Sequence, residues 1–215
     1  AAANGAVQYL PVIADPRAGE PRIVFAPHLY SFNYEAAMTY ASGDTTVAKW
    51  EAARGAETRV QNWPILMGEF GMDPSYPGAS RYLDDVLEMA DRSMVSWAYW
   101  TYDGSWGFWD RTTMTERPHV DQIVRTYPQR IAGTPRGWTW DRTTHVFTLT
   151  FDTASGVTGP TEIFVPAERF YPAGFDVQLD DPAGTWTQSF DATRRVLSVT
   201  TGTTVLSHTI TVRPR

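Results

Sequence analysis

The chain has 215 residues and no cysteine, and its 18 Lys and Arg against 24 Asp and Glu give a formal charge of −6. The length allows one large or two small domains, and the absence of cysteine excludes disulfides, thiolate metal ligands and a cysteine nucleophile. The negative charge argues against nucleic acid as the main ligand, and no apolar run approaches the roughly 20 residues that cross a bilayer.

The first half of the chain alternates between two kinds of segment. Short apolar, β-rich runs alternate with segments in which apolar residues recur at helical spacing. Continuous apolar strands between amphipathic helices indicate a parallel sheet covered by helices. In chain order we predict a strand at 22–30, a helix at 44–59, a strand at 64–70, a helix at 80–94, a strand at 95–102 and a helix at 119–127.

Beyond Gly133 the pattern changes to short segments of alternating polarity that are separated by turn-rich stretches. This pattern predicts a small antiparallel β-sandwich. We therefore divide the chain into residues 1–131 and residues 132–215, with the junction within 128–136. The predicted strands of the second domain are 144–151, 161–165, 175–179, 195–200 and 205–212.

Three strand–helix units do not close a parallel barrel, since a complete (β/α)8 barrel needs about 250 residues. The expected fold class is therefore α/β plus all-β: the C-terminal three βα units of a TIM (β/α)8 barrel, followed by a small antiparallel β-sandwich. Residues 1–21 would lead into the first of these strands. The first residue is not Met and no signal-peptide pattern is visible, so we expect a mature, trimmed or excised piece of a longer protein.

Aromatic residues make up 13% of the chain and concentrate at residues 97–109, which hold seven of them interleaved with Gly104, Ser105 and Gly107. A loop lined with rings suits the C–H faces of sugars, and such loops often form sites. The competing interpretation is a Trp-rich corner of the core.

Glu69 lies near the end of the apolar run PILMGEF. The carboxyl ends of barrel strands open into the active site, and the flanking Gly68 and Gly71 would let backbone and substrate approach closely. Glu69 is therefore a candidate catalytic carboxylate. The alternative is a structural glutamate in an ion pair across the barrel mouth.

His28 and Tyr30 end the preceding strand, and their separation of two residues places both on one side of it. The Tyr30 hydroxyl could hold the Glu69 carboxylate ionised, while His28 could bind sugar hydroxyls. Alternatively, His28 caps a loop and Tyr30 packs in the core. Trp100 ends the third strand, either as a platform under a sugar ring or as core packing.

Three motifs on successive strand ends, APHLYSF, MGEFGM and WAYWTYDGSWGFWD, resemble strands six, seven and eight of clan A glycoside hydrolases. The closest resemblance is to glycoside hydrolase family 5, and within it to the endoglycoceramidase branch. The later segments TEIFVP, RFYPAGFDV and ITVRP are similar to the β domain that follows the barrel in these enzymes.

The resemblance implies a retaining glycosidase that cleaves the β-glycosidic bond between oligosaccharide and ceramide in glycosphingolipids, without a cofactor, and secreted from a bacterium. Glu69 matches the family nucleophile, and Tyr30 matches the residue hydrogen-bonded to it. His28 matches a substrate-contacting histidine and Trp100 the sugar platform. The family's acid/base lies in an Asn-Glu-Pro motif on strand four, which this sequence lacks. The resemblance therefore implies a partner: an N-terminal fragment of the same enzyme that carries this motif.

The loop after the third strand supplies further substrate-binding candidates, of which Asp103 is otherwise a turn residue. Ring side chains bury apolar area yet tolerate a wet edge, which suits a glycolipid at an interface. The rival interpretation packs these rings between the barrel and the sandwich. The residues expected to line the aglycone side are Trp106, Phe108 and Trp109, together with Phe32 and Tyr34.

Two non-catalytic interpretations remain open. The chain could be a carbohydrate-binding or a structural C-terminal portion of another family 5 β-glycanase, with the sandwich and its Trp138, Trp140 and Trp186 as the working module. A companion chain with Asn-Glu-Pro would favour the enzyme instead. No metal site is expected, because the four histidines are too dispersed for a ligand set.

Overall fold

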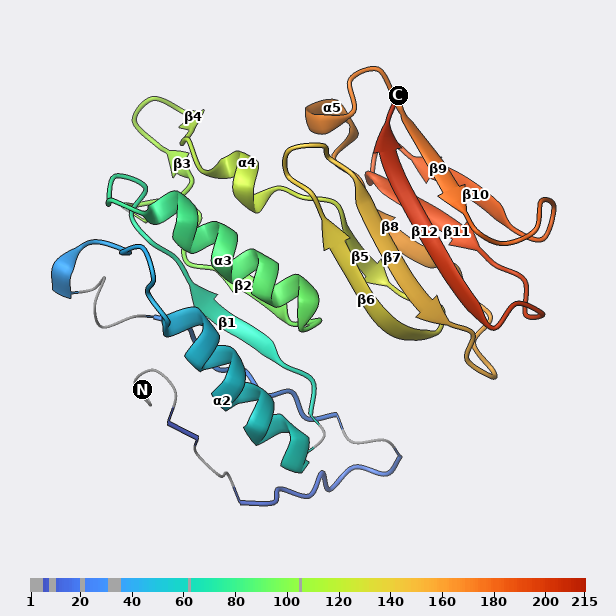
Figure 1. Cartoon of the computed structure of the whole chain (residues 1–215), viewed down its shortest axis with the longest axis horizontal. Helices are drawn as coiled ribbons and strands as arrows, with labels where there is room; N and C mark the ends of the chain where they lie inside the picture. Colours follow the sequence, from blue (N-terminus) through green and yellow to red (C-terminus); the bar gives the residue numbers. More distant parts are fainter. Residues whose placement is uncertain (1–5, 8–10, 20–21, 31–35, 62, 105) are drawn as a thin grey trace. The chain divides into compact units, whose positions relative to one another are not determined.

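The computed structural model describes residues 6–7, 11–19, 22–30, 36–61, 63–104 and 106–215 (Figure 1). The chain forms two compact units, Ala1–Ile123 and Val124–Arg215. The first unit is α/β and the second is all-β, as the sequence predicts at this coarse level. Residues 124–131, assigned above to the first domain, belong to the second unit, because the strand that begins at Tyr127 pairs there.

The first unit is built on parallel strands. β1 (Leu66–Phe70) pairs in parallel with β2 (Ser96–Tyr99). Residues 22–30, predicted as a full strand, form two isolated parallel bridges instead, Phe25 to Ile65 just before β1 and Leu29 to Phe70 at its end, one on each side of Pro27. Because proline has no N–H, it removes one donor from this ladder.

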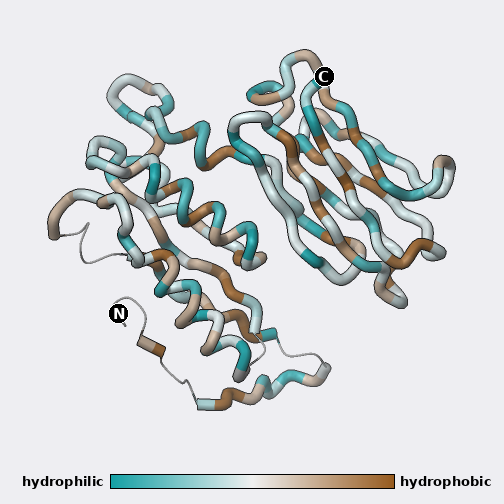
Figure 2. The backbone as a smooth tube through the Cα atoms, in the orientation of Figure 1, coloured by the Kyte–Doolittle hydropathy of each residue, from teal (hydrophilic) through white to brown (hydrophobic). Residues whose placement is uncertain are grey.

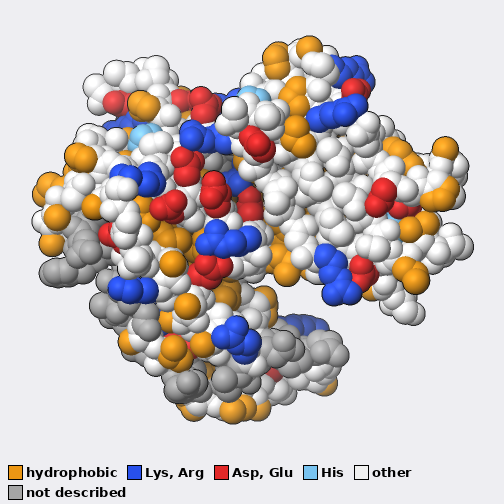
Figure 3. Space-filling view, viewed as in Figure 1, with side chains coloured by type: hydrophobic (Ala, Val, Ile, Leu, Met, Phe, Trp, Pro, Cys, Tyr) orange, Lys and Arg blue, Asp and Glu red, His pale blue; other side chains and the backbone are white. Residues whose placement is uncertain are grey.

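Two helices, α2 (Thr46–Gln61) and α3 (Ala79–Arg92), flank β1 (Figure 1). The Asp44 carboxylate accepts the Thr46 N–H at 2.7 Å and thereby satisfies a free donor where α2 begins. Figure 3 shows acidic and basic side chains along the outer side of α3, whose apolar side is buried. Both helices and β1 contribute to one core cluster: Leu29, Tyr40, Val47, Trp50, Met67, Phe70, Met72, Ala79, Tyr82, Leu83, Val86, Leu87, Met89, Ala90 and Val95.

β1 contains a β-bulge just before it ends. Met67 and Phe70 are three positions apart, whereas their partners on β2, Trp97 and Tyr99, are two positions apart. The bridges on the other side show the same extra residue, because Phe25 and Leu29 are four positions apart and their partners, Ile65 and Phe70, are five positions apart. A bulge inserts one unpaired residue and re-aims the side chains around it. Met67 and Phe70 are consequently both fully buried in the same core cluster, and Glu69 lies between them, outside that cluster.

The chain after β2 is less regular than predicted. Two short strands, β3 (Trp109–Asp110) and β4 (Thr115–Glu116), form an antiparallel hairpin. The helix predicted over 119–127 is wrong beyond its first turn, because α4 is only Val120–Ile123. The residues that follow enter the first sheet of the second unit, which ends the helix early.

The second unit has two four-stranded antiparallel sheets, in the orders β10-β11-β8-β5 and β6-β7-β12-β9. The sequence predicts five of these strands and misses β5, β6, β10 and the short helix α5. Their bounds are β5 (Tyr127–Arg130), β6 (Thr134–Trp140), β7 (Phe147–Asp152), β8 (Thr161–Phe164), α5 (Ala167–Phe170), β9 (Phe175–Leu179), β10 (Thr187–Asp191), β11 (Val196–Thr200) and β12 (Ser207–Pro214).

Alternate residues of the paired strands form the core of the second unit. Phe147, Leu149 and Phe151 of β7 are fully buried with Ile163 of the other sheet, and Figure 2 shows hydrophobic residues recurring along the strands of this unit. Trp140 is buried in the same cluster. This tryptophan therefore does not present an open ring to a sugar, whereas Trp138 and Trp186 are only partly buried against the same cluster.

Candidate active site

Glu69 lies at the carboxyl end of β1, next to the segment that carries His28 and Tyr30. The Tyr30 hydroxyl donates to Glu69 Oε2 at 3.3 Å, and His28 Nδ1 lies 3.3 Å from the same oxygen. The side chain of His28 is 50% exposed and that of Glu69 is 31% exposed, so the group is open to solvent. The structure thus brings together three residues that the sequence predicts as a group.

Two glycines allow close packing around Glu69. A methyl group on Gly68 would lie 3.0 Å from His28 Nε2, so the imidazole ring rests against bare backbone at this position. A methyl group on Gly71 would overlap the carbonyl oxygen of Trp100. A larger residue at either position would therefore displace His28 or the backbone of Trp100.

Trp106 reaches this group from the loop after β2. Its ring centroid is 6.0 Å from that of Tyr30. Its carbonyl oxygen accepts a hydrogen bond from the Tyr99 hydroxyl at 2.8 Å. Burial raises the pKa of Tyr99 to about 12, so this hydroxyl stays protonated and remains a donor at neutral pH. The loop is therefore anchored where it places Trp106 beside Tyr30.

Phe108 lies further along the same loop and has different neighbours. Its ring is 5.9 Å from that of Tyr99 and 5.4 Å from that of Tyr102. Tyr102 in turn stacks on Trp109 at 6.3 Å. Within the first unit Phe108 therefore joins a cluster of loop rings. Phe32 and Tyr34, predicted to lie beside these rings, fall outside the described residues.

Trp100 and Asp103 complete the predicted set. The Trp100 side chain is 51% exposed, which does not fit the core-packing alternative. Its peptide bond to Thr101 is cis. Asp103 forms an ion pair with Arg111, a partner that the sequence analysis does not predict. The Asp103 carboxylate is thus engaged within its own loop.

Chemically, the group provides a single carboxylate with two side-chain contacts on one oxygen, one of which is the hydrogen bond from Tyr30. A carboxylate held in this way can serve as a nucleophile, a base or an electrostatic stabiliser. In the part of the chain that the structure describes, no three His, Asp or Glu residues are placed to hold a metal ion. No helix among the described residues is long and apolar enough to cross a membrane.

Sequence reasoning misses two residues near this group, Trp50 of α2 and Tyr82 of α3. Both donate side-chain hydrogen bonds to the backbone of the segment that carries His28 and Tyr30. Both also sit in the apolar core cluster. Their positions in the helical pattern indicate burial only, so the sequence holds no signal for this second role.

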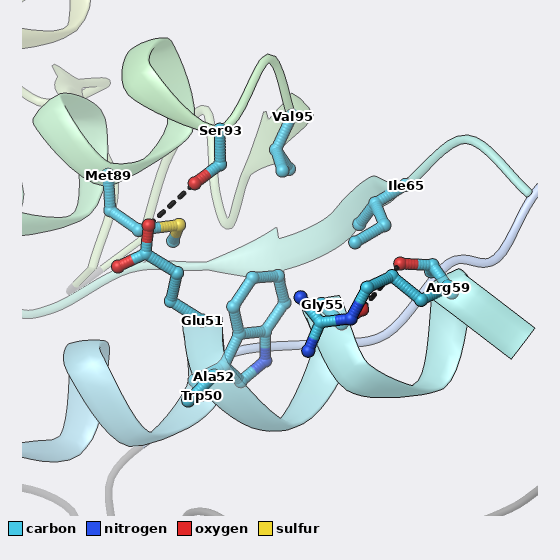
Figure 4. Close-up of a pocket in the computed structure, with 10 residues that line it drawn as sticks. Trp50, Glu51, Ala52, Gly55, Arg59, Ile65, Met89, Ser93 and Val95 are labelled. Carbon is cyan, nitrogen blue, oxygen red and sulfur yellow. Dashed lines mark hydrogen bonds between the residues drawn. The ribbon is translucent and has the colours of Figure 1, made fainter. Parts of the chain in front are cut away.

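A pocket of about 460 Å³ lies between α2 and α3 (Figure 4). Its lining includes Ile65 and Val95, which directly precede β1 and β2, whereas Glu69 lies at the opposite end of β1. The Ser93 hydroxyl donates to Glu51 at 2.6 Å at its wall. Because its lining comes from the N-terminal ends of the strands, this pocket is not part of the candidate active site.

Comparison with known proteins gives the family. Residues 2–105 match the family described as Cellulase (glycosyl hydrolase family 5). Residues 125–212 match the Glycoside hydrolase family 5 C-terminal domain. The two matches follow one another along the chain and together include most of it. The chain therefore belongs to glycoside hydrolase family 5.

Within that family the chain is similar to endoglycoceramidases. It is 31% identical to Endoglycoceramidase I of Rhodococcus hoagii (strain 103S) over 169 residues, which are 74% of this chain and 31% of that protein. It matches the ganglioside GM3 complex of endo-glycoceramidase II from Rhodococcus sp. with a TM-score of 0.86 and 31% identity, over 99% of this chain and 47% of that one. The lactosyl–enzyme intermediate of the same enzyme gives a TM-score of 0.83 and 33% identity, over 99% and 46%. The chain thus spans less than half the length of these relatives.

Proposed function

We propose that this chain is the C-terminal part of a retaining glycosidase that cleaves between the oligosaccharide and the ceramide of glycosphingolipids. In this proposal the first unit supplies strands six to eight of a (β/α)8 barrel, and the second unit is the C-terminal β-sandwich. A complementary portion supplies the other strands and the Asn-Glu-Pro acid/base. We call this chain and the complementary portion together the assembled enzyme.

The observation that carries the proposal is the position of Glu69 at the carboxyl end of a parallel strand, where the Tyr30 hydroxyl donates to it and the His28 ring contacts it. Barrel enzymes place their catalytic groups at this end of the strands. Tyr30 and His28 both contact Oε2, so we assign Oε1 as the attacking oxygen. The hydrogen bond from Tyr30 favours the ionised carboxylate, which is the nucleophilic form.

The proposed reaction has two displacements at the anomeric carbon. In the first, Glu69 Oε1 forms a bond to this carbon while the acid of the complementary portion protonates the departing oxygen, so ceramide leaves as an alcohol. In the second, the same complementary residue takes a proton from water, and the water oxygen replaces Glu69. The sugar leaves with its configuration retained and Glu69 is regenerated. The lactosyl–enzyme intermediate of the Rhodococcus relative supports a covalent step of this kind.

A glycosphingolipid is the substrate class that the relatives support best. One of the similar structures is a ganglioside GM3 complex. Half-exposed Trp100 offers an apolar ring to a sugar, and Trp106 lies beside Tyr30. We propose that the sugar lies over Trp100 and that the loop carrying Trp106 faces the ceramide.

The Glu69→Gln variant tests the proposed nucleophile. Glutamine keeps the size of the side chain and its hydrogen bonding but cannot attack the anomeric carbon. In the assembled enzyme we expect kcat on ganglioside GM3 to fall by at least ~1,000-fold, about 4 kcal/mol, with little change in melting temperature. Glu88→Gln, on the exposed side of α3, is the matched control and should leave kcat unchanged.

A covalent label provides an independent measurement. An activated 2-deoxy-2-fluoro glycoside should leave its sugar on Glu69, located by mass spectrometry of the digested protein. Near-normal turnover of Glu69→Gln, or a label on another carboxylate, would show that Glu69 has a structural role instead.

A further inference from the structure

The backbone segment that carries His28 and Tyr30 runs alongside β1 in a ladder of backbone hydrogen bonds, two of which lie next to the candidate site. Gly68 N–H donates to the Pro27 carbonyl at 3.0 Å, and Leu29 N–H donates to the Glu69 carbonyl at 2.9 Å. Pro27 itself has no N–H to donate. The ladder therefore has a gap at Pro27, directly before His28, where other contacts can add to the hold on the segment.

Two buried aromatic side chains supply such contacts from the outer helices. Trp50 Nε1–H, from α2, donates to the carbonyl oxygen of His28 at 2.9 Å. The Tyr82 hydroxyl, from α3, donates to the carbonyl oxygen of Leu29 at 3.0 Å. Both aromatic residues are buried in the core cluster. Two consecutive peptide groups, which flank Leu29, are thus each held by a different helix.

The position of these peptide groups decides whether Tyr30 reaches Glu69. The Tyr30 hydroxyl lies 3.3 Å from Glu69 Oε2, beyond the usual range of about 2.5–3.0 Å for an O–H···O hydrogen bond. A small outward shift of the segment would therefore break this contact. The His28 ring, which lies against Gly68, would move with it.

We propose that Trp50 and Tyr82 are positioning residues. From α2 and α3 they hold the backbone of the segment that carries His28 and Tyr30, and so keep both side chains next to the Glu69 carboxylate. This inference rests on the proposed function, in which Glu69 is the nucleophile. Misplacing a catalytic group by about 1 Å costs up to about 100-fold in rate. Loss of either donor should therefore slow turnover more than it weakens substrate binding.

The Tyr82→Phe variant, in the assembled enzyme, removes only the hydroxyl. Tyr40→Phe is a matched control, because Tyr40 lies 5.4 Å from Tyr82 in the same core and donates its hydroxyl to Asp85 at 2.7 Å. Each variant loses one buried hydrogen bond, so both should lower the melting temperature. Only Tyr82→Phe should lower kcat on ganglioside GM3, by about 10-fold to 100-fold, with KM nearly constant.

A double-variant cycle separates positioning from general destabilisation. If Tyr82 acts through Tyr30, the kcat losses of Tyr82→Phe and Tyr30→Phe should be strongly non-additive, and both should move the acidic limb of the pH profile in the same direction. Trp50→Phe, which keeps a ring but lacks the donor, should show the same pattern. This second variant keeps the test decisive if Tyr82→Phe does not fold.

Two results separate this inference from the proposed function. If Glu69→Gln stays active, the proposed function fails whatever Tyr82→Phe does. If Glu69→Gln is inactive but Tyr82→Phe and Trp50→Phe match Tyr40→Phe in kcat and pH profile, only the positioning role is wrong. Additive losses in the double variant would also overturn that role.

Discussion

At the candidate nucleophile, one carboxylate oxygen receives both side-chain contacts. The Tyr30 hydroxyl and the His28 ring nitrogen each lie 3.3 Å from Glu69 Oε2. Hydrogen bonds to a charged group contribute about 1.5–3 kcal/mol, and they favour the charged form. Since the Glu69 side chain is only 31% exposed, water replaces a lost partner incompletely. The pH dependence of the enzyme should therefore report on Tyr30.

The Tyr30→Phe variant should shift the acidic side of that pH dependence. Without the hydroxyl, the ionised carboxylate loses a stabilising donor. We expect lower activity in the assembled enzyme, and the acidic limb of kcat/KM should move to higher pH. A pH series with a soluble aryl glycoside measures this limb. An unshifted limb with unchanged activity would place Tyr30 away from the nucleophile during catalysis.

The sequence predicts contacts between residues when these contacts follow from spacing along one strand and from position at a strand end. His28 and Tyr30 share a side of their segment because they are two apart, and Glu69 ends the next strand. Tertiary packing decides the contacts that sequence reasoning misses. The ion pair of Asp103 with Arg111 depends on how one loop folds. The hydrogen bond that Trp50 donates depends on how α2 is rotated about its axis. Helical spacing in the sequence does not specify this rotation.

Among the elements, two of the three strands that escape prediction, β5 and β6, have interrupted alternation, whereas the third, β10, pairs regularly with β11. β5 contains Pro128 and β6 contains Pro135 and Gly137, and each of these strands shows a register shift at these positions. A bulge absorbs the residue that does not fit, so pairing continues where a strict period of two fails. Strict alternation of polar and apolar residues in the sequence therefore identifies regular strands such as β7 and overlooks irregular ones.

The loop after β2 gives a test of the proposed ceramide side. Trp106 lies beside Tyr30, whereas Phe108 packs among loop rings. In the assembled enzyme we expect Trp106→Ala to lower kcat/KM on a ceramide-linked substrate by about 10-fold, a loss of about 1.4 kcal/mol, and to change hydrolysis of a soluble aryl glycoside little.

Phe108→Ala is the matched comparison for that loop. Removing it should lower the melting temperature and reduce activity on both substrates alike, because its neighbours are Tyr99 and Tyr102. If Trp106→Ala also reduces both activities equally and destabilises the protein, the loop serves packing and does not face the lipid.

On the scale of the whole molecule, the two units differ in how complete their sheets are. The second unit has two four-stranded antiparallel sheets over one core. In the first unit, β2 pairs only with β1 among the described strands. A parallel sheet with an open edge exposes backbone donors and acceptors that invite pairing with another chain.

We therefore expect the two units to behave differently in isolation. A protein of residues 124–215 should melt in one cooperative transition, because its core is self-contained. The 215-residue chain alone should self-associate through the first unit, and the complementary portion should suppress this association and raise its melting temperature. Sedimentation and calorimetry measure both effects. A soluble 215-residue monomer that melts cooperatively would contradict the need for a complementary portion.

The extra residue in β1 limits how the segment that carries Glu69 can be grafted. β1 has five residues, and its bulge lets Met67 and Phe70 share the core while Glu69 stays outside it. In a host strand without the bulge, the same five residues would alternate strictly, so Glu69 would turn toward the helices and Phe70 toward the mouth. A designer who copies this segment into another parallel sheet must therefore transfer the irregular register along with the residues, because the side-chain identities alone would place the carboxylate on the opposite face.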